Sequence, residues 1–413
     1  MRVLLSTIGS RGDVQPLVAL ASELTALGQE ARMCVPPDFR DWIDGLGIPV
    51  VPIGPVLRPA APAGPPAGQP AGQALLTPEQ QHLLIEDTLG TQFATIPAAA
   101  QGCGIILGAG VQQIAARSIA EMLGVPYIHV SYCPVTLPSP HHAPPPLWET
   151  EPAPAAADNR ALWAGDARCW NGAVGAALNS YRASSGLPPV TDVRSHILTD
   201  RPWLASDPTL GPWPEPADTD VAQTGAWIAP DRRDLPTELA GFLEAGEPPI
   251  YFGFGSMPAP HDLGRMMTRT ARGLGRRAIV SRGWAGLSVP DGEPDCLSIG
   301  EVNQQALFRR VAAVVHHGGA GTTTTAAQAG APQVVIPQRY DQHYWAQQIH
   351  RLGIGAAHSP AVPTVGSLRA ALSQALRPET AARARAVAAA VHTDGARAAA
   401  QSLIACANRE VRR

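Results

Sequence analysis

The sequence predicts two consecutive α/β domains, each built on a parallel sheet of the doubly wound, Rossmann-like kind. Three observations predict this fold class. The chain has 413 residues, which is more than one hydrophobic core usually organises. Hydrophobic residues make up 45% of it and charged residues 16%, as in ordinary globular proteins. A buried strand, a glycine-bearing turn and a helix follow one another at the amino terminus, and this succession restarts at Pro249.

The amino-terminal domain is predicted over residues 1–205. Its first eight residues are aliphatic and β-branched, which is typical of a buried parallel strand. A turn over residues 9–13 and a helical pattern over residues 14–27 follow. Shorter apolar runs predict further strands at residues 32–35, 104–109 and 126–130, with a helix at residues 112–123.

Three proline-rich segments interrupt this domain pattern. Residues 52–73 and 134–154 have few large apolar side chains and are predicted to be loops that shape the mouth of a site for a bulky ligand. Residues 206–225 are also rich in proline and poor in core residues. We therefore expect the linker between the domains there.

The carboxy-terminal domain is predicted over residues 226–392. Buried strands are expected at residues 249–253, 277–281, 311–316 and 334–337. A final helix is predicted over about residues 379–408, and residues 393–413 are expected to pack back on the amino-terminal domain.

The charge and cysteine patterns exclude several classes of protein. A formal net charge of −3 favours neither nucleic acid nor an anionic membrane as a partner. The six cysteines contain no C-x-x-C pair, no secretory leader precedes the first strand, and no apolar stretch reaches the length of a membrane span, so a cytoplasmic protein is expected. The D-x-D pattern from Asp218 to Asp220 lies in the predicted linker and is interpreted as solvated loop, so no metal site is predicted.

The strongest local signal is the segment from His316 to Thr325, which leaves a predicted strand and enters a helix through two glycines. Such a junction presents unpaired N–H groups and the positive end of the helix dipole to an anion. It therefore predicts a phosphate site, to which His317 can add a donor. The alternative is a helix start with ordinary turn glycines.

Two further turns follow strands in the same way. Ser256 follows the glycine-containing turn after the strand at residue 253 and is expected near the same phosphate, although such a turn is often only loop geometry. The first turn places Asp13 at the cap of the first helix, and an N-cap carboxylate is one reading of it. The other reading is a general base that takes the proton of an acceptor hydroxyl. An ordinary aspartate is too weak a base for an alcohol, so that role needs a buried site or an acidic phenol.

Two more strand ends carry candidate ligand contacts. Asp341 and Gln342 follow the strand at residues 334–337, and together they are suited to holding neighbouring sugar hydroxyls. Arg282 and Trp284 follow another strand, and the indole offers a flat apolar face to a base. Taken alone, Asp341 and Gln342 are better explained as an ordinary polar loop, and Trp284 is as readily explained by plain packing as by contact with a base.

Taken together, these motifs resemble the glycosyltransferases of glycopeptide-antibiotic biosynthesis. The resemblance covers nearly the whole chain in the right order: residues 9–16, 253–256, 281–284, 299–303, 316–322 and 337–342. It implies the GT-B fold, with two Rossmann-like domains facing each other across a cleft and a carboxy-terminal helix returning to the first domain. It also implies a metal-independent, inverting transfer of a sugar from a nucleoside diphosphate, with no cofactor.

The resemblance assigns roles to single residues. Asp13 becomes the catalytic base, and Asp341 the partner that holds the sugar. The acceptor cleft lies in the amino-terminal domain, with candidate contacts at Tyr132, His141 and Trp148. Donor contacts are implied at Ser10, Arg11, Gly12, Ser256, Arg282, Trp284, Val302, His317, Gly318, Gly319, Gly321, Thr322 and Gln342.

Two departures from related enzymes bear on the substrates. Plant-type enzymes keep a glutamate for the ribose diol where this chain has Thr325. A donor without the 2′-hydroxyl needs no such acceptor, so a dTDP-sugar is favoured over a UDP-sugar. The insertion at residues 59–73 is longer than is usual in the glycopeptide enzymes and leaves the aglycone open.

Two rival functions remain at this point. A nucleotide-sugar 2-epimerase has the same architecture and needs no aglycone, and a catalytically silent protein would only stabilise an active transferase. Asp13 and Asp341 together favour an active enzyme. The function predicted from the sequence is therefore transfer of a sugar from a dTDP- or UDP-sugar to a hydroxyl of a natural-product aglycone. A glycopeptide antibiotic is one candidate for that aglycone.

Overall fold

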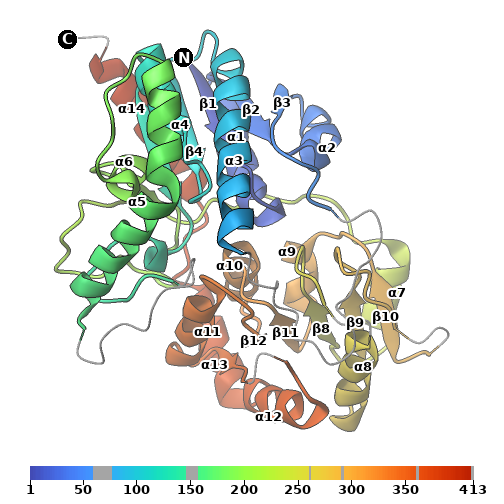
Figure 1. The fold of residues 1–413 in the computed structure, drawn as a ribbon. Coiled ribbons are helices and arrows are strands. Elements are labelled where there is room, and N and C mark those ends of the chain that lie inside the picture. Colours follow the sequence, from blue (N-terminus) through green and yellow to red (C-terminus); the bar gives the residue numbers. More distant parts are fainter. Residues whose placement is uncertain (59–76, 146–156, 260–261, 290–292, 360–361, 411–413) are drawn as a thin grey trace.

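The computed structural model describes residues 1–58, 77–145, 157–259, 262–289, 293–359 and 362–410. Two parallel sheets, each covered by helices on both faces, lie one above the other (Figure 1). The long aliphatic strands are buried on both sides, as the near-continuous apolar runs in the sequence require. The loop predicted at residues 52–73 falls mostly outside the described residues.

The first sheet has seven parallel strands in the order β3-β2-β1-β4-β5-β6-β7. The strands are β1 (Arg2–Ser6), β2 (Glu30–Val35), β3 (Val50–Pro52), β4 (Ile105–Ala109), β5 (Tyr127–Ser131), β6 (Trp203–Leu204) and β7 (Ala222–Gln223). The helices are α1 (Arg11–Ala26), α2 (Arg40–Asp44), α3 (Pro78–Ala99), α4 (Ala116–Leu123), α5 (Asn159–Ser184) and α6 (Val193–Leu198), with 3₁₀ turns at Pro37–Phe39 and Pro134–Thr136.

The segment predicted as linker needs a correction. Strand β7 lies inside residues 206–225 and pairs with β6 as the last strand of the first sheet. The prolines before it form an irregular connection, and their ring geometry excludes them from most sheet positions. The chain therefore leaves the first sheet only after Gln223.

The second sheet has six parallel strands in the order β10-β9-β8-β11-β12-β13. They are β8 (Ile250–Gly253), β9 (Ala278–Ser281), β10 (Cys296–Ile299), β11 (Ala313–His316), β12 (Gln333–Val335) and β13 (Gly355–Ala357). The helices are α7 (Thr237–Glu244), α8 (Leu263–Gly273), α9 (Gln304–Leu307), α10 (Ala320–Gln328), α11 (Gln342–Arg351), α12 (Val365–Ala375) and α13 (Pro378–Ala388), with a 3₁₀ turn at Phe308–Arg310.

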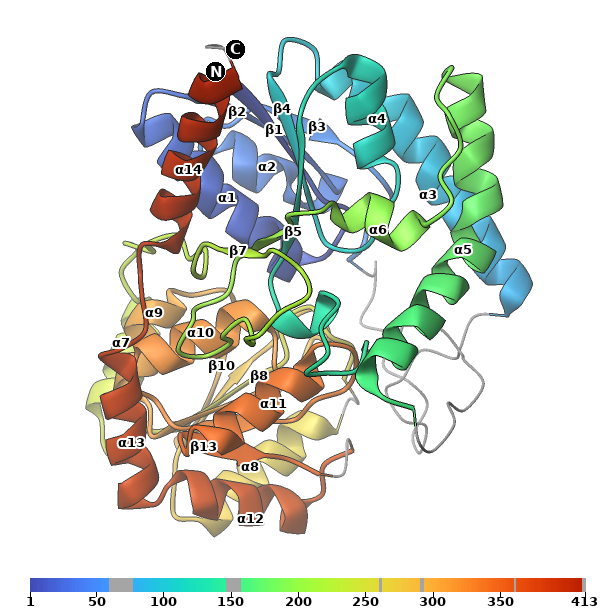
Figure 2. The ribbon, with the colours of Figure 1, turned by 90° about the vertical axis from the view of Figure 1, so that its left-hand side faces the viewer.

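The carboxyl terminus returns to the first domain, as Figure 2 shows. The helix predicted over about residues 379–408 is in fact two helices, α13 and α14 (Gly395–Glu410). The break falls at residues 389–394, where Asp207 accepts a hydrogen bond of 2.8 Å from the His392 N–H. Beyond it, Ala399 and Leu403 are fully buried in the same core as Leu17 of α1. In the described part of the chain, no helix has the length and apolar character of a membrane span.

Both sheets reverse their strand order at one point, between β1 and β4 in the first and between β8 and β11 in the second. Ligands of doubly wound proteins bind outside the carboxyl ends of the strands at such points. The turns at residues 9–13, 110–113, 253–256 and 316–319 follow these four strands. The fold therefore brings the predicted site turns to the two places where a ligand is expected.

Candidate active site

The turn after β1 holds the carboxylate of Asp13 against bare backbone. A Cβ atom on Gly9 would lie 2.2 Å from Asp13 Oδ2, and one on Gly110 would lie 3.8 Å from Oδ1. Only glycine at position 9 therefore leaves room for the carboxylate between the ends of β1 and β4. The Ser10 hydroxyl donates a hydrogen bond of 3.3 Å to Asp13 Oδ2.

The expectation that Asp13 caps the first helix is wrong. Ser10 is the N-cap residue and Asp13 is the third residue of α1. Its side chain turns back over Gly9, and α1 has no side-chain hydrogen bond from its N-cap residue. Burial raises the pKa of Asp13 above its ordinary value, and the Ser10 hydrogen bonds oppose this only in part.

Asp341 faces Asp13 from the other domain. It precedes α11, in the loop that leaves β12. Burial, and then the charge of Asp13, raises the pKa of Asp341 to about 7. The positive charge of Arg339 lowers the pKa of both carboxyl groups. The cleft thus holds two interacting carboxyl groups and the guanidinium of Arg339. The sequence motifs did not single out Arg339.

The turn after β11 has a different chemistry. A Cβ atom on Gly319 would lie 2.7 Å from His317 Nε2, and one on Gly255 would lie 3.4 Å from His317 Cε1, so two glycines enclose the imidazole. Burial lowers the pKa of His317 to about 3, with further lowering by His316 and Arg339, so the ring is neutral. Among the described residues, His317 Nδ1 has no hydrogen-bond partner.

Helix α10 begins at Ala320, one residue after Gly319, and no side chain caps it. Its first amide N–H groups are therefore available to an anion. Gly318 has a φ of 96°, which favours glycine, and its N–H donates 3.1 Å to His316 Nδ1. Gly321 and Thr322 lie half-buried on the first turn of this helix, and Ser256 lies half-buried after β8.

Two residues predicted to bind the donor, Trp284 and Arg11, contact residues of the other domain. Trp284 stacks on Phe39 of the first domain, with ring centroids 6.3 Å apart and planes 22° from parallel. Arg11 donates two hydrogen bonds, of 2.8 and 2.9 Å, to the Glu301 carboxylate and lies 4.4 Å from the centroid of the Trp42 ring. The roles of Arg11 and Trp284 in donor binding stay predictions.

The remaining predicted donor residues vary in accessibility. Gly12 and Arg282 are exposed, and Val302 packs against an apolar cluster of the second domain. Gln342 is buried, and its side-chain oxygen accepts hydrogen bonds of 2.9 Å from the Gln338 N–H and 3.3 Å from the Arg339 N–H. Its amide nitrogen donates to Met257 Sδ over 3.6 Å. In this structure Gln342 therefore fixes the loop that carries Arg339 and Asp341.

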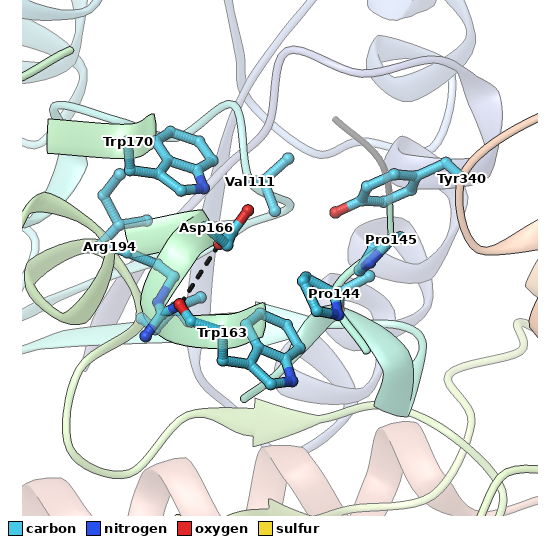
Figure 3. A pocket seen from close by; sticks show the side chains of 11 residues that line it. Val111, Pro144, Pro145, Trp163, Asp166, Trp170, Arg194 and Tyr340 are labelled. Atoms are coloured by element: carbon cyan, nitrogen blue, oxygen red, sulfur yellow. Dashed lines mark hydrogen bonds and ion pairs between the residues drawn. The ribbon is translucent and has the colours of Figure 1, made fainter. Parts of the chain in front are cut away.

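A pocket opens beside this loop on the side of the first domain (Figure 3). Trp163, Asp166 and Trp170 line it from α5, and Tyr340 lines it from the second domain. The other lining residues are Val111, Thr136, Pro144, Pro145, Arg194, Ile197 and Leu198. Sequence reasoning missed this set, although Trp163, Asp166 and Trp170 have the spacing of one helix face.

Tyr132 and His141, two of the predicted acceptor contacts, do not line this pocket. Tyr132 donates its hydroxyl to the Asp13 carbonyl over 2.9 Å and so supports the turn that carries Asp13. His141 Nε2 lies 2.8 Å from the Pro216 carbonyl. Trp148 lies outside the described residues. In the D-x-D segment, Asp218 pairs with Arg160 at 2.9 Å and Asp220 with Arg201 at 3.2 Å.

Comparisons with known proteins identify glycosyltransferases as relatives of this chain. Residues 3–139 match the family model "Glycosyltransferase family 28 N-terminal domain", and residues 288–404 match "Erythromycin biosynthesis protein CIII-like, C-terminal domain". The chain is 52% identical to glycosyltransferase GtfE of Amycolatopsis orientalis, over 99% of this chain and 98% of the relative. It is 49% identical to the vancomycin aglycone glucosyltransferase of the same organism, with the same two coverages.

A solved structure shows the same fold. Glycosyltransferase VinC in complex with dTDP aligns over 99% of this chain and 100% of that one, with a TM-score of 0.67 and 18% identity. The two parallel-sheet domains that face each other at their strand ends are thus those of the GT-B fold. The identities over nearly the full length decide the family: this chain is a natural-product glycosyltransferase of the glycopeptide-antibiotic type.

Proposed function

We propose that the protein transfers a sugar from a dTDP-sugar to a hydroxyl of a glycopeptide-type aglycone, with inversion at the anomeric carbon and without a metal ion. The observation that carries this proposal is the position of Asp13. Its carboxylate lies at the strand-order reversal of the first sheet and interacts across the cleft with Asp341. Ligands of both domains would meet at this point.

Asp13 acts as the general base in this proposal. The acceptor hydroxyl gives its proton to the Asp13 carboxylate while its oxygen forms the bond to the anomeric carbon. The bond from that carbon to the diphosphate oxygen breaks, and its electron pair leaves with the diphosphate. Burial raises the pKa of Asp13, which brings the base nearer to the acidity of the hydroxyl and makes proton transfer more favourable.

The start of α10 receives the leaving diphosphate. Its uncapped N–H groups and the helix dipole stabilise negative charge, and they are fixed in place before the reaction. His317 is neutral, with a pKa lowered to about 3. It therefore donates one N–H to an anion without carrying a charge, and the enclosing glycines keep the ring in one orientation.

Asp341 holds the transferred sugar. Its carboxyl group interacts with that of Asp13, and with a pKa raised to about 7 it titrates near neutral pH. Such a group can accept from one sugar hydroxyl or donate to a sugar oxygen, depending on its protonation. The buried side chain of Gln342 keeps this loop in place.

The nucleotide is proposed to be dTDP in preference to UDP. Thr325 occupies the place of the ribose-binding glutamate of plant-type relatives, so the carboxylate that would accept from a 2′-hydroxyl is missing at that position. The solved relative VinC was crystallised with dTDP. All six cysteines are free thiols, which supports the proposal that the enzyme works in the reducing cytoplasm.

The deciding experiment measures nucleoside diphosphate release from dTDP- and UDP-sugars, each with and without a glycopeptide aglycone and in the presence of EDTA. We expect release only with the aglycone, a matching mass gain on it, and an inverted anomeric centre by NMR. Interconversion of the sugar without aglycone would support the epimerase. Tight nucleotide binding with no product from any mixture would support a silent partner.

A further inference from the structure

Residues 224–233 connect the last strand of the first sheet to the second domain, and Trp227 is the largest side chain on this connection. Its side chain is 1% exposed and belongs to the same apolar core of the first domain as Leu17 of α1. The indole N–H donates a hydrogen bond of 3.0 Å to the hydroxyl of Thr224. This end of the connection is therefore fixed to the first domain.

A single side chain, that of Tyr132, lies between Trp227 and the turn that carries Asp13. The two rings meet edge to face, with centroids 6.4 Å apart and planes at 77°. The Tyr132 hydroxyl donates a hydrogen bond of 2.9 Å to the main-chain carbonyl of Asp13. Burial, and then the charge of Asp13, raises the pKa of Tyr132 well above its ordinary value, so the hydroxyl keeps its proton and remains a donor. The backbone of residue 13 is thus tied to the domain connection.

The far end of this connection is fixed to the donor loop, which is the segment 300–303 after β10. Gln305 Nε2 donates 2.7 Å to the Ala229 carbonyl, and Gln305 Oε1 accepts 3.2 Å from the Asp231 N–H. Asn303 Nδ2 donates 2.9 Å to the Asp231 carbonyl. Asn303 directly follows Val302, a predicted donor contact. Packed side chains and hydrogen bonds therefore lead from the turn after β1 to the donor loop, as energetic coupling between two sites requires.

The second connection between the domains touches the first. Residues 389–394 lead from α13 to α14, and Figure 2 shows this connection beside the one that follows β7. A Cβ atom on Gly395 would lie 2.5 Å from the carbonyl carbon of Gly225, so the two backbones meet at bare glycines. Gly225 has a φ of 85°, in the left-handed region that favours glycine. The two crossings therefore meet two residues before Trp227.

We propose that Tyr132 and Trp227 are positioning residues, which hold the backbone of Asp13 at a fixed place relative to the donor loop. Neither side chain contacts the reacting atoms in this proposal, and both act through residue 13. Tyr132 then serves the base, whereas the sequence predicted it as an acceptor contact. A misplacement of about 1 Å can cost about 10²-fold in rate, so a hydrogen bond behind the base matters for turnover. This inference rests on the proposed function, because it assumes that Asp13 is the general base.

Tyr132→Phe keeps the ring on Trp227 and removes only the hydroxyl. With an active aglycone, we expect kcat to fall about tenfold while the Kd of dTDP stays within about twofold, because the lost hydrogen bond reaches only the Asp13 carbonyl. Tyr127→Phe, on the strand that Tyr132 follows, is the matched control. The buried Tyr127 hydroxyl has no hydrogen-bond partner in the described part of the chain, so kcat should not change. A Tyr132→Phe protein with the kcat of the parent would overturn the proposal.

Amide hydrogen exchange of the protein without substrates tests the positioning itself, independently of turnover. Tyr132→Phe should speed exchange at least threefold in a peptide covering residues 9–20 and leave residues 320–328 unchanged, because local opening depends on local contacts. If exchange in residues 9–20 does not change, Tyr132 does not hold the turn, and the inference fails whether or not the protein transfers a sugar. If exchange speeds up but kcat is unchanged in both Tyr132→Phe and Asp13→Asn, Asp13 is not the base, and the proposed mechanism fails together with the role of Tyr132 in it.

Trp227→Phe tests whether the effect extends to the domain connection. Trp203→Phe is its matched control, because Trp203 meets the same indole edge to face at 6.4 Å and belongs to the same core. Both variants remove an indole from that core and should lower the unfolding temperature. At a temperature where both are folded, kcat should fall about threefold or more in Trp227→Phe and stay within about twofold in Trp203→Phe. Equal kcat values in the two variants would overturn the role assigned to Trp227.

Discussion

The two strand–turn–helix units at the cleft have the same topology and opposite electrostatics. In the first domain, the turn between β1 and α1 folds the Asp13 carboxylate back over Gly9. In the second domain, the turn between β11 and α10 holds a neutral imidazole over Gly319, next to an uncapped helix start. A single side chain therefore decides whether such a turn attracts a proton or an anion.

The comparison teaches that the glycines serve different purposes in the two turns. Gly9 makes space for a charged side chain of its own helix, whereas Gly319 makes space for His317 and leaves backbone N–H groups open. A carboxylate in the second turn would repel a diphosphate, and an imidazole in the first would share its site with Asp341. The two chemistries complement each other only because the domains face each other.

The largest expected effect is at Asp13. Asp13→Asn keeps the shape of the turn and removes the base, so kcat should fall by about 10²–10⁴-fold, the usual contribution of a general base. Donor affinity, measured by titration with dTDP, should stay within about twofold. Ser10→Ala removes the hydrogen bond to Asp13 together with the predicted donor contact of Ser10, so its kcat is the milder comparison. Unchanged turnover in Asp13→Asn would mean that another group takes the proton.

The second turn should respond in donor binding. Gly319→Ala places a Cβ atom 2.7 Å from His317 Nε2, which forces the ring out of its position. The Kd of dTDP should rise about tenfold or more, while the unfolding temperature changes little. Gly241→Ala is the matched control, since a Cβ atom there meets nothing within 4 Å. If both variants bind dTDP like the parent, the diphosphate does not sit at this turn.

The cleft carboxyl groups should make stability depend on pH. The pKa of Asp341 is raised to about 7 in the folded protein, so ionisation opposes folding, and its stabilising protonated form is lost as the pH rises through about 7. Asp341→Asn removes this penalty. The free energy of unfolding of Asp341→Asn, relative to that of the parent protein, should increase by about 1–2 kcal/mol between pH 5 and pH 8. If the unfolding temperatures of variant and parent differ by the same amount at both pH values, the raised pKa of Asp341 does not contribute to stability.

Sequence reasoning found the turns more readily than the pocket. Glycines after buried strands marked Asp13 and His317 because strand, turn and helix follow one another locally along the chain. The exchange of roles at Ser10 and Asp13 was missed, because α1 begins at Arg11, three residues before the start predicted at residue 14. Arg339, Tyr340 and the α5 face were also missed, because only the packing of distant segments brings them together.

The same limit explains why the sequence does not reveal the partners that Arg11 and Trp284 have in the other domain. Nothing near Arg11 in the sequence indicates that Glu301, 290 positions later, accepts its hydrogen bonds. Likewise, the flat face of Trp284 is covered by Phe39, from another domain. A motif predicts which chemistry a residue can perform, whereas the competing partner follows from tertiary structure.

The smallest expected effect tests this competition. The Glu301 side chain is 64% exposed, and an exposed ion pair contributes about 0–1 kcal/mol, so Glu301→Gln should hardly change the unfolding temperature. If Arg11 binds the diphosphate, it must first leave Glu301, and the variant removes that competition. Its Kd for dTDP should then fall by about twofold, with the difference shrinking in high salt because exposed charges are screened. Arg40→Gln, which breaks the exposed pair with Asp44 within α2, should leave the Kd unchanged. An unchanged or raised Kd in Glu301→Gln would place Arg11 with the domain contact and outside the donor site.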